Sequence, residues 1–169
     1  YTSGSTGTPK GVLVTHAGIA DMTASHQGLL GLDESARLLQ FVSISFDVAL
    51  SDICLALLSG AALVIPVAAR LAGEELSRAI DKASVTHATL PAAVLESLPR
   101  EPLSTLRSVI VGGDSLAAET ADFWTEQVAL VNAYGPTETT VAATLGRTAP
   151  GGGVPAIGVP VRNTSVFVL

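Results

Sequence analysis

Short apolar runs alternate with helical patterns of about ten residues along most of the chain, and this alternation limits its fold more than any other feature. The strand-like runs fall at 38–44, 61–65, 86–90, 108–111 and 129–132, and the helical patterns fall at 15–30, 47–58, 73–83, 91–98 and 117–127. Strands joined through helices pair in parallel and need helices on the sheet faces. The sequence therefore predicts an α/β fold with a parallel-rich sheet and flanking helices.

The composition supports a packed core and excludes several functions. Of the 169 residues, 48% are hydrophobic and 14% are charged, which excludes a disordered chain. The net charge of −6 and the absence of a Lys/Arg run argue against a nucleic-acid or anionic-membrane partner. The apolar stretch 48–71 is interrupted by Asp52, Gly60 and Pro66, so we expect a buried helix and strand there and no membrane span. The single cysteine, Cys54, predicts a reduced thiol in a cytoplasmic protein.

The opening segment combines three glycines, five Ser/Thr hydroxyls and one lysine within eleven residues. Glycines let backbone N–H groups converge on an anion, and a lysine supplies a point charge for a phosphate. The segment is no Walker A loop, because Pro9 precedes Lys10 and Gly11 follows it. A flexible linker is the alternative, but the Pro-Lys-Gly ending leads straight into an apolar run. The expected phosphate contacts are Thr2, Ser3, Gly4, Ser5, Thr6, Gly7 and Lys10.

A second motif, Asn-Ala-Tyr-Gly-Pro-Thr-Glu-Thr-Thr, occupies 132–140 and follows an expected strand. ATP binding asks for an aromatic face, a hydroxyl and a carboxylate, and Tyr134, Thr137 and Glu138 supply these three types. Mg²⁺ is typically held by one or two carboxylates together with phosphate oxygens. The alternative is a Gly-Pro turn with a capping Thr-Glu pair.

The two motifs, in this order, resemble those of adenylate-forming (AMP-binding) enzymes, which include adenylation domains, acyl-CoA synthetases and luciferases. The resemblance implies that Tyr134 stacks on adenine, Asn132 contacts its amino edge, Thr137 touches the α-phosphate and Glu138 binds Mg²⁺. Lys10, Thr137 and Glu138 are then the expected catalytic residues. Further expected nucleotide contacts are Gly113, Asp114, Ala133 and Gly135.

The segment Phe-Asp-Val-Ala-Leu-Ser at 46–51 resembles the amino-acid-activating branch of that superfamily, the adenylation domains of nonribosomal peptide synthetases. The resemblance implies that Asp47 binds the substrate α-ammonium as a charge-assisted pair. Losing one partner of such a pair costs roughly 2–5 kcal/mol. The alternative is that Asp47 caps the following helix. The segment 154–164 also resembles the family, although Ala156 intrudes between Pro155 and Ile157.

The resemblance further implies a set of residues around the substrate side chain. They are Asp47, Val48, Ser51, Thr89, Ile110, Gly112, Ala133, Val141 and Ala142. The small residues leave volume, and beyond Asp47 nothing in the set is charged, so a charged guest side chain would lie unpaired. Ser51 and Thr89 offer hydroxyl partners to a phenol or indole. We therefore expect an aromatic amino acid, tyrosine before tryptophan or phenylalanine.

As implied by the resemblance, the enzyme activates an amino acid with ATP as aminoacyl-AMP and loads it onto a carrier-protein phosphopantetheine thiol. Carrier and condensation domains of the same assembly line are the expected partners. We expect 1–169 to be an internal fragment of one adenylation domain, within its large N-terminal part, without the C-terminal subdomain and inactive alone. An acyl- or aryl-CoA ligase and a non-catalytic nucleotide-binding fragment are the alternatives.

Overall fold

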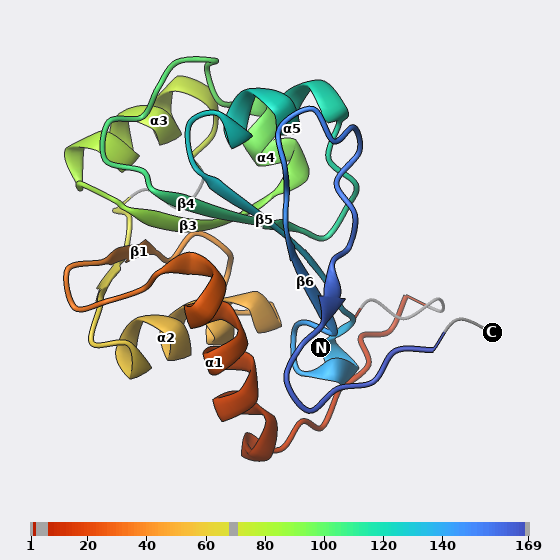
Figure 1. Ribbon diagram of the computed structural model, residues 1–169. Coiled ribbons are helices and arrows are strands. Elements are labelled where there is room, and N and C mark those ends of the chain that lie inside the picture. The colour runs from red at the N-terminus through yellow and green to blue at the C-terminus, as the bar shows by residue number, and fades with distance from the viewer. Residues whose placement is uncertain (1, 3–6, 68–70, 168–169) are drawn as a thin grey trace.

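The computed structural model describes residues 2, 7–67 and 71–167 and shows a mixed α/β arrangement around one seven-stranded sheet (Figure 1). The strand order is β2-β1-β3-β4-β5-β6-β7. The strands are β1 (Arg37–Leu39), β2 (Ala62–Val64), β3 (His87–Pro91), β4 (Ser108–Gly112), β5 (Ala129–Tyr134), β6 (Thr144–Arg147) and β7 (Val159–Pro160). Strands β1 to β5 pair in parallel, while β6 and β7 pair antiparallel. The predicted parallel-rich α/β fold is confirmed.

Helices lie on both faces of this sheet, α3, α4 and α5 on one side and α1 and α2 on the other (Figure 1). The helices are α1 (Ile19–Leu30), α2 (Asp47–Leu58), α3 (Gly73–Lys82), α4 (Ala92–Ser97) and α5 (Ala118–Thr125), and the short 3₁₀ turns are η1 (His16–Gly18) and η2 (Thr137–Thr139). The central strands are apolar at successive positions because both faces are covered. In β4, for example, Val109 and Val111 pack with α3 to α5, whereas Ile110 packs with α1 and α2.

Two strand predictions differ from the structure. The expected strand 38–44 shortens to β1: the Gln40 backbone N–H still donates to the Val64 carbonyl, but the chain then leaves the sheet and turns at 44–45. Strands β6 and β7 were not expected, since their sequences carry no apolar run of their own. Pairing with β5 holds β6 in place, so the signal for it lies in a neighbour distant along the chain.

The helix 47–58 was expected to be buried on all sides, and the structure corrects this. Helix α2 packs with one side on α1, β1 and β2, while Leu50, Leu57 and Leu58 are exposed. Within the described part of the chain, none of the helices combines the length and hydropathy that a membrane crossing requires.

Candidate functional site

The predicted site residues gather at the carboxyl edge of the parallel strands. Pro91, Gly112 and Ala133 lie in register across β3, β4 and β5 at that edge, and the chain then enters Gly113 on one strand and Tyr134 on the next. The loop after β1 leads from the same edge into the start of α2. Ligands of open α/β sheets bind outside the carboxyl ends of the strands, so the arrangement places the turns after β4 and β5, and Asp47, where a ligand is expected.

The residues predicted to surround the substrate side chain share the α1/α2 side of the sheet. Thr89 and Ile110 are register partners on β3 and β4, and Ile110 packs in one cluster with Ala142 and Ala133. Ser51 is buried on α2. Val48, also on α2, and Val141, beside Ala142, are half-buried.

Asp47 is the first residue of α2 and is half-buried. The N-cap position belongs to Phe46, whose side chain makes no capping hydrogen bond. The alternative that Asp47 caps the helix therefore differs from the structure by one position. A carboxylate in the first turn still interacts favourably with the positive end of the helix dipole. The helix thus stabilises a negative charge at the edge of the site.

Asp52, five residues further along α2, was not assigned from the sequence. Its side chain is fully buried, and its Oδ1 accepts a 2.6 Å hydrogen bond from Thr89 Oγ1. Burial raises the pKa of the Asp52 carboxyl to about 7, although the Thr89 hydrogen bond lowers it. An acidic residue inside an otherwise apolar helix was the available signal.

Asn132 is held in one orientation by the chain that follows β6. Its Nδ2 donates to the carbonyls of Pro155 and Ala156 at 3.2 and 3.1 Å. Because both N–H donors are used in this way, Oδ1 is the amide atom that remains to accept a hydrogen bond from a ligand. Tyr134 lies two residues on, at the strand end, and is 56% exposed, so its ring is accessible for stacking.

The turn after Tyr134 depends on Gly135. A Cβ at this position would lie 2.5 Å from the Ala143 backbone nitrogen, so any side chain would push the two segments apart. Thr137 and Glu138 follow in η2, the first half-buried and the second exposed. Thr140 and Val141 then adopt φ values of 60° and 74°. Such values are strained for β-branched residues and occur preferentially at functional sites.

The opening loop is closed at its base by two 2.9 Å backbone hydrogen bonds between Thr2 and Lys10. Gly7 has a left-handed φ of 79°, and Lys10 is exposed. The predicted contacts Ser3, Gly4, Ser5 and Thr6 lie outside the described residues.

The segment after the loop touches the second motif directly. A Cβ on Gly18 would lie 3.0 Å from Thr140 Oγ1, and Gly18 and Thr139 line a hollow of about 110 Å³ between them. The Asn163 amide also donates to Asp21 Oδ2 at 3.0 Å. The segment at Gly18, which follows the opening loop, therefore packs against Thr139 and Thr140 in the turn after Glu138.

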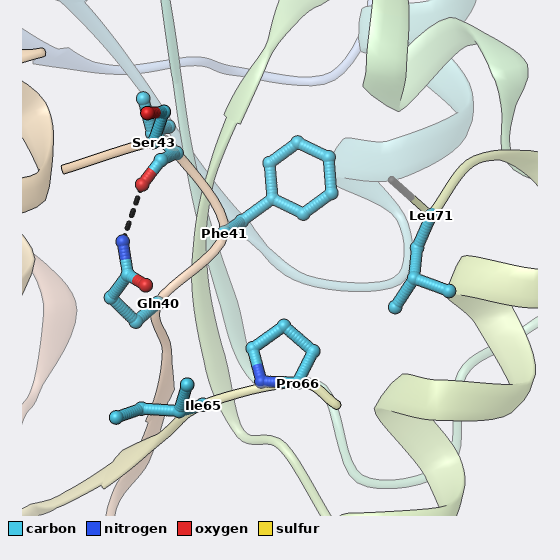
Figure 2. Close-up of a pocket in the computed structure, with 7 residues that line it drawn as sticks. Gln40, Phe41, Ser43, Ile65, Pro66 and Leu71 are labelled. Atoms are coloured by element: carbon cyan, nitrogen blue, oxygen red, sulfur yellow. Dashed lines mark hydrogen bonds between the residues drawn. The ribbon is translucent and has the colours of Figure 1, made fainter. Parts of the chain in front are cut away.

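A larger hollow of about 240 Å³ lies at the ends of β1 and β2 (Figure 2). It is lined by Gln40, Phe41, Val42, Ser43, Ile65, Pro66 and Leu71. None of the predicted site residues lines it, and we assign no ligand to it. Its place beside the loop that leads to Asp47 makes it a neighbour of the site.

No cluster of three metal-ligating side chains occurs among the described residues. His26 and His87 are buried and hydrogen-bonded to the Met22 and Leu30 carbonyls. These contacts give both rings a packing role within the fold.

The comparisons with known proteins agree with this geometry. The chain matches the family model of AMP-binding enzymes over residues 1–169. Over its full length it is 44% identical to the probable non-canonical nonribosomal peptide synthetase CymA of Salinispora arenicola, of which it spans 2%. The adenylation domain AlmE of Vibrio cholerae, solved in complex with glycyl-adenosine-5'-phosphate, superposes with a TM-score of 0.84 at 30% identity, covering 94% of this chain and 32% of that one.

A further solved structure is PA1221, a nonribosomal peptide synthetase protein containing adenylation and PCP domains, with a TM-score of 0.84 at 30% identity. The alignment covers 95% of this chain and 34% of that one. The chain thus spans a small part of CymA and about a third of the two solved chains. On the full-length family match and these likenesses, the chain belongs to the family of AMP-binding enzymes.

Proposed function

We propose that the chain forms the ATP- and amino-acid-binding part of an adenylation domain in a nonribosomal peptide synthetase. The observation that carries this proposal is the position of Asp47 at the carboxyl edge of the sheet that also presents the 132–140 motif. CymA is named as such a synthetase, and AlmE was solved with an aminoacyl adenylate. We take 1–169 as a part of one adenylation domain, because it spans about a third of the AlmE and PA1221 chains.

The nucleotide base fits the Asn132–Tyr134 end of β5. Adenine carries an exocyclic amine, which donates protons, and Asn132 Oδ1 is the acceptor that its two backbone contacts leave available. Tyr134 offers its exposed ring for stacking. Gly113 and Asp114 follow the neighbouring strand at the same edge and border the same base.

Three residues, Lys10, Thr137 and Glu138, interact with the phosphates directly or through Mg²⁺. Glu138 is an exposed carboxylate, which is the ligand type that Mg²⁺ prefers. When bound, this ion neutralises charge on the phosphate oxygens. Thr137 donates its hydroxyl to the α-phosphate, and Lys10 neutralises the departing pyrophosphate.

Asp47 orients the nucleophile by pairing with its α-ammonium. A substrate carboxylate oxygen then forms a bond to the α-phosphorus while the bond to the pyrophosphate oxygen breaks, giving aminoacyl-AMP and pyrophosphate. Positioning and charge stabilisation contribute most of the catalysis in such a displacement. The side-chain contacts would come from the α1/α2 face of the sheet, and we propose an aromatic guest, tyrosine first.

In the second half-reaction, a phosphopantetheine thiol of a carrier domain attacks the adenylate, forming a thioester and releasing AMP. PA1221 contains such a carrier domain beside its adenylation domain. We propose carrier and condensation domains as partners and, because the reaction consumes ATP, a cytoplasmic location.

Amino-acid-dependent ATP–pyrophosphate exchange in the full-length protein tests the proposal. Asp47→Ala should lower exchange at least about 30-fold, as expected for a lost charge pair. The matched control is Asp81→Ala on the exposed face of α3, which should leave exchange unchanged. Hydroxylamine trapping that proceeds with fatty or aryl acids but not with amino acids would favour the CoA-ligase alternative. A protein that binds ATP without any exchange would favour the non-catalytic one.

A further inference from the structure

Asp52 is a buried carboxyl that the proposed reaction does not use. It has no exposed surface, and its Oδ2 is the only charged-group atom among the buried, unpartnered side-chain atoms of the described residues. Buried carboxylates are normally paired with a cation or several donors, because an isolated one is costly. Among the described residues, its side chain accepts one hydrogen bond, from the Thr89 hydroxyl. A group retained at such a cost calls for an explanation.

Its position links it to the substrate side-chain site. Asp52 follows Ser51 on α2, and its partner Thr89 lies on β3 in register with Ile110. Thr89 is half-buried, whereas Asp52 lies behind it between helix and sheet. Of the two bonded side chains, Thr89 is thus the one that retains exposed surface for a ligand.

The chemistry of the pair fixes what Thr89 presents to that region. A hydroxyl has one proton and two lone pairs, whereas an ionised carboxylate has only lone pairs. Above its raised pKa of about 7 Asp52 is ionised, so the Thr89 hydroxyl donates its proton to Oδ1 and only its lone pairs remain for a ligand. A half-buried acceptor of this kind is left unsatisfied by an apolar guest and repelled by a carboxylate guest.

We propose that Asp52 is a positioning residue that holds the Thr89 hydroxyl as an acceptor and so selects amino acids whose side chain ends in an O–H or N–H donor. The inference rests on the proposed function and deepens it, because it names the chemical class of the substrate side chain. Sites that hydrogen-bond a substrate hydroxyl reject the analogue lacking it far more strongly than apolar pockets distinguish size.

A purely structural role for the pair predicts a different outcome. If the bond only held α2 against β3, its loss would lower stability and would reduce the exchange rate with every amino acid by the same factor. A selecting role changes the ratio between matched substrates. The ratio of kcat/KM within one matched pair therefore separates the two explanations.

The experiment measures pyrophosphate exchange by the full-length protein at pH 8 with all proteinogenic amino acids. Matched pairs such as tyrosine and phenylalanine, or threonine and valine, differ by a hydroxyl. The best substrate should carry a donor and exceed its apolar counterpart by about 100-fold or more in kcat/KM. Exchange with amino acids whose best member is apolar would overturn the inference and leave the proposed function standing. No exchange with any amino acid would overturn both.

Three variants sharpen the test. Thr89→Val should lower the ratio of kcat/KM between the donor substrate and its apolar counterpart at least about tenfold. Thr89→Ser keeps the hydroxyl and should keep the preference. Asp52→Asn can donate an amide N–H to Thr89, which releases the hydroxyl proton and should reduce the preference. Equal loss on both substrates in Thr89→Val would overturn the inference, even if Asp52→Asn failed to fold.

Discussion

The two faces of the sheet differ in the side chains that they bury. The face under α3, α4 and α5 is a continuous apolar cluster that includes Leu76, Leu95 and Trp124, each at most 1% exposed. The face under α1 and α2 has a smaller apolar cluster and also buries Asp52 and His87. Burial of apolar side chains on the first face stabilises the fold. The second face also buries polar side chains, which lie beside the proposed site.

This difference shows how one sheet can provide stability on one face and a binding site on the other. Each central strand sends alternate residues to opposite faces, so a strand such as β4 contributes Val109 and Val111 to the apolar layer and Ile110 and Gly112 to the site layer. A polar residue on one face leaves the packing of the other untouched. Substitutions on the two faces should therefore have separable effects on stability and specificity.

The largest expected effect is on the apolar face. Trp124→Ala removes a fully buried indole that packs edge-on against Phe123 at 5.2 Å between ring centroids. We expect a loss of about 5 kcal/mol in the free energy of unfolding, at the upper end for such truncations. Thermal and chemical unfolding of the full-length protein measure it, with Leu57→Ala on the exposed side of α2 as the control. A change in amino-acid preference in the folded fraction of Trp124→Ala would contradict the separation of the faces.

The second effect is a pH dependence from the site face. The pKa of Asp52 is raised to about 7 by burial, so between pH 4 and 7 the folded state keeps a proton that the unfolded chain releases. Stability should fall as the pH rises through this window, by on the order of 3 to 4 kcal/mol in full. Unfolding curves of Asp52→Asn against the wild type should isolate this decline, since the amide does not titrate.

Removing the Thr89 hydrogen bond offers a check on this assignment. That bond lowers the pKa of Asp52, so Thr89→Val should raise it and extend the decline in stability to higher pH. A wild-type curve with the same slope as Asp52→Asn would show that Asp52 stays ionised throughout, contrary to the prediction.

Sequence periodicity predicted the apolar face well and the site face incompletely. The alternation of apolar residues located α3 and β4 within about two residues, because both follow from local burial patterns. The motif residues were assigned by resemblance, and the structure brings many of them to one edge. Their roles in binding and catalysis remain predictions.

What the sequence did not predict depends on contacts between distant segments. The Asp52–Thr89 hydrogen bond joins residues 37 positions apart, and the Asn132 amide is oriented by carbonyls 23 and 24 positions away. Strand β6 likewise forms because β5 offers it an edge. No local pattern encodes such pairings, so they emerge only once the sheet order is known.

The third prediction concerns His87, which ties the site face to the end of α1. Its Nε2 donates to the Leu30 carbonyl, and its Nδ1 accepts from Thr86 Oγ1. Burial lowers the pKa of His87, so the stability it contributes is complete above the unfolded-state pKa, near 6.5, and is lost as the pH falls below it.

His87→Gln should lower the free energy of unfolding by about 1–2 kcal/mol at pH 8, because one of the two hydrogen bonds is lost. It should also give a shallower decline below pH 6.5. The exposed His16→Gln is the control. The opposite sign of the Asp52 effect means that each variant should be compared as a difference from the wild type. An unchanged acid slope in His87→Gln would show that His87 does not titrate between the two states.

The smallest expected effect adds one methyl group to the site face. A Cβ at Gly112 would lie 2.9 Å from the Ala133 carbonyl oxygen, so Gly112→Ala must shift one of two paired strands and should cost about 1 kcal/mol. Gly28→Ala on α1 is the matched control, because nothing lies within 4 Å of its added Cβ and alanine favours the helix. The Gly112 variant should raise the amino-acid KM in pyrophosphate exchange, while the Gly28 variant should not. If Gly112→Ala left the amino-acid KM unchanged despite the lost stability, the guest side chain would have to lie away from β4. Its contacts would then come from α2 alone, and the proposed role of this sheet face in specificity would be wrong.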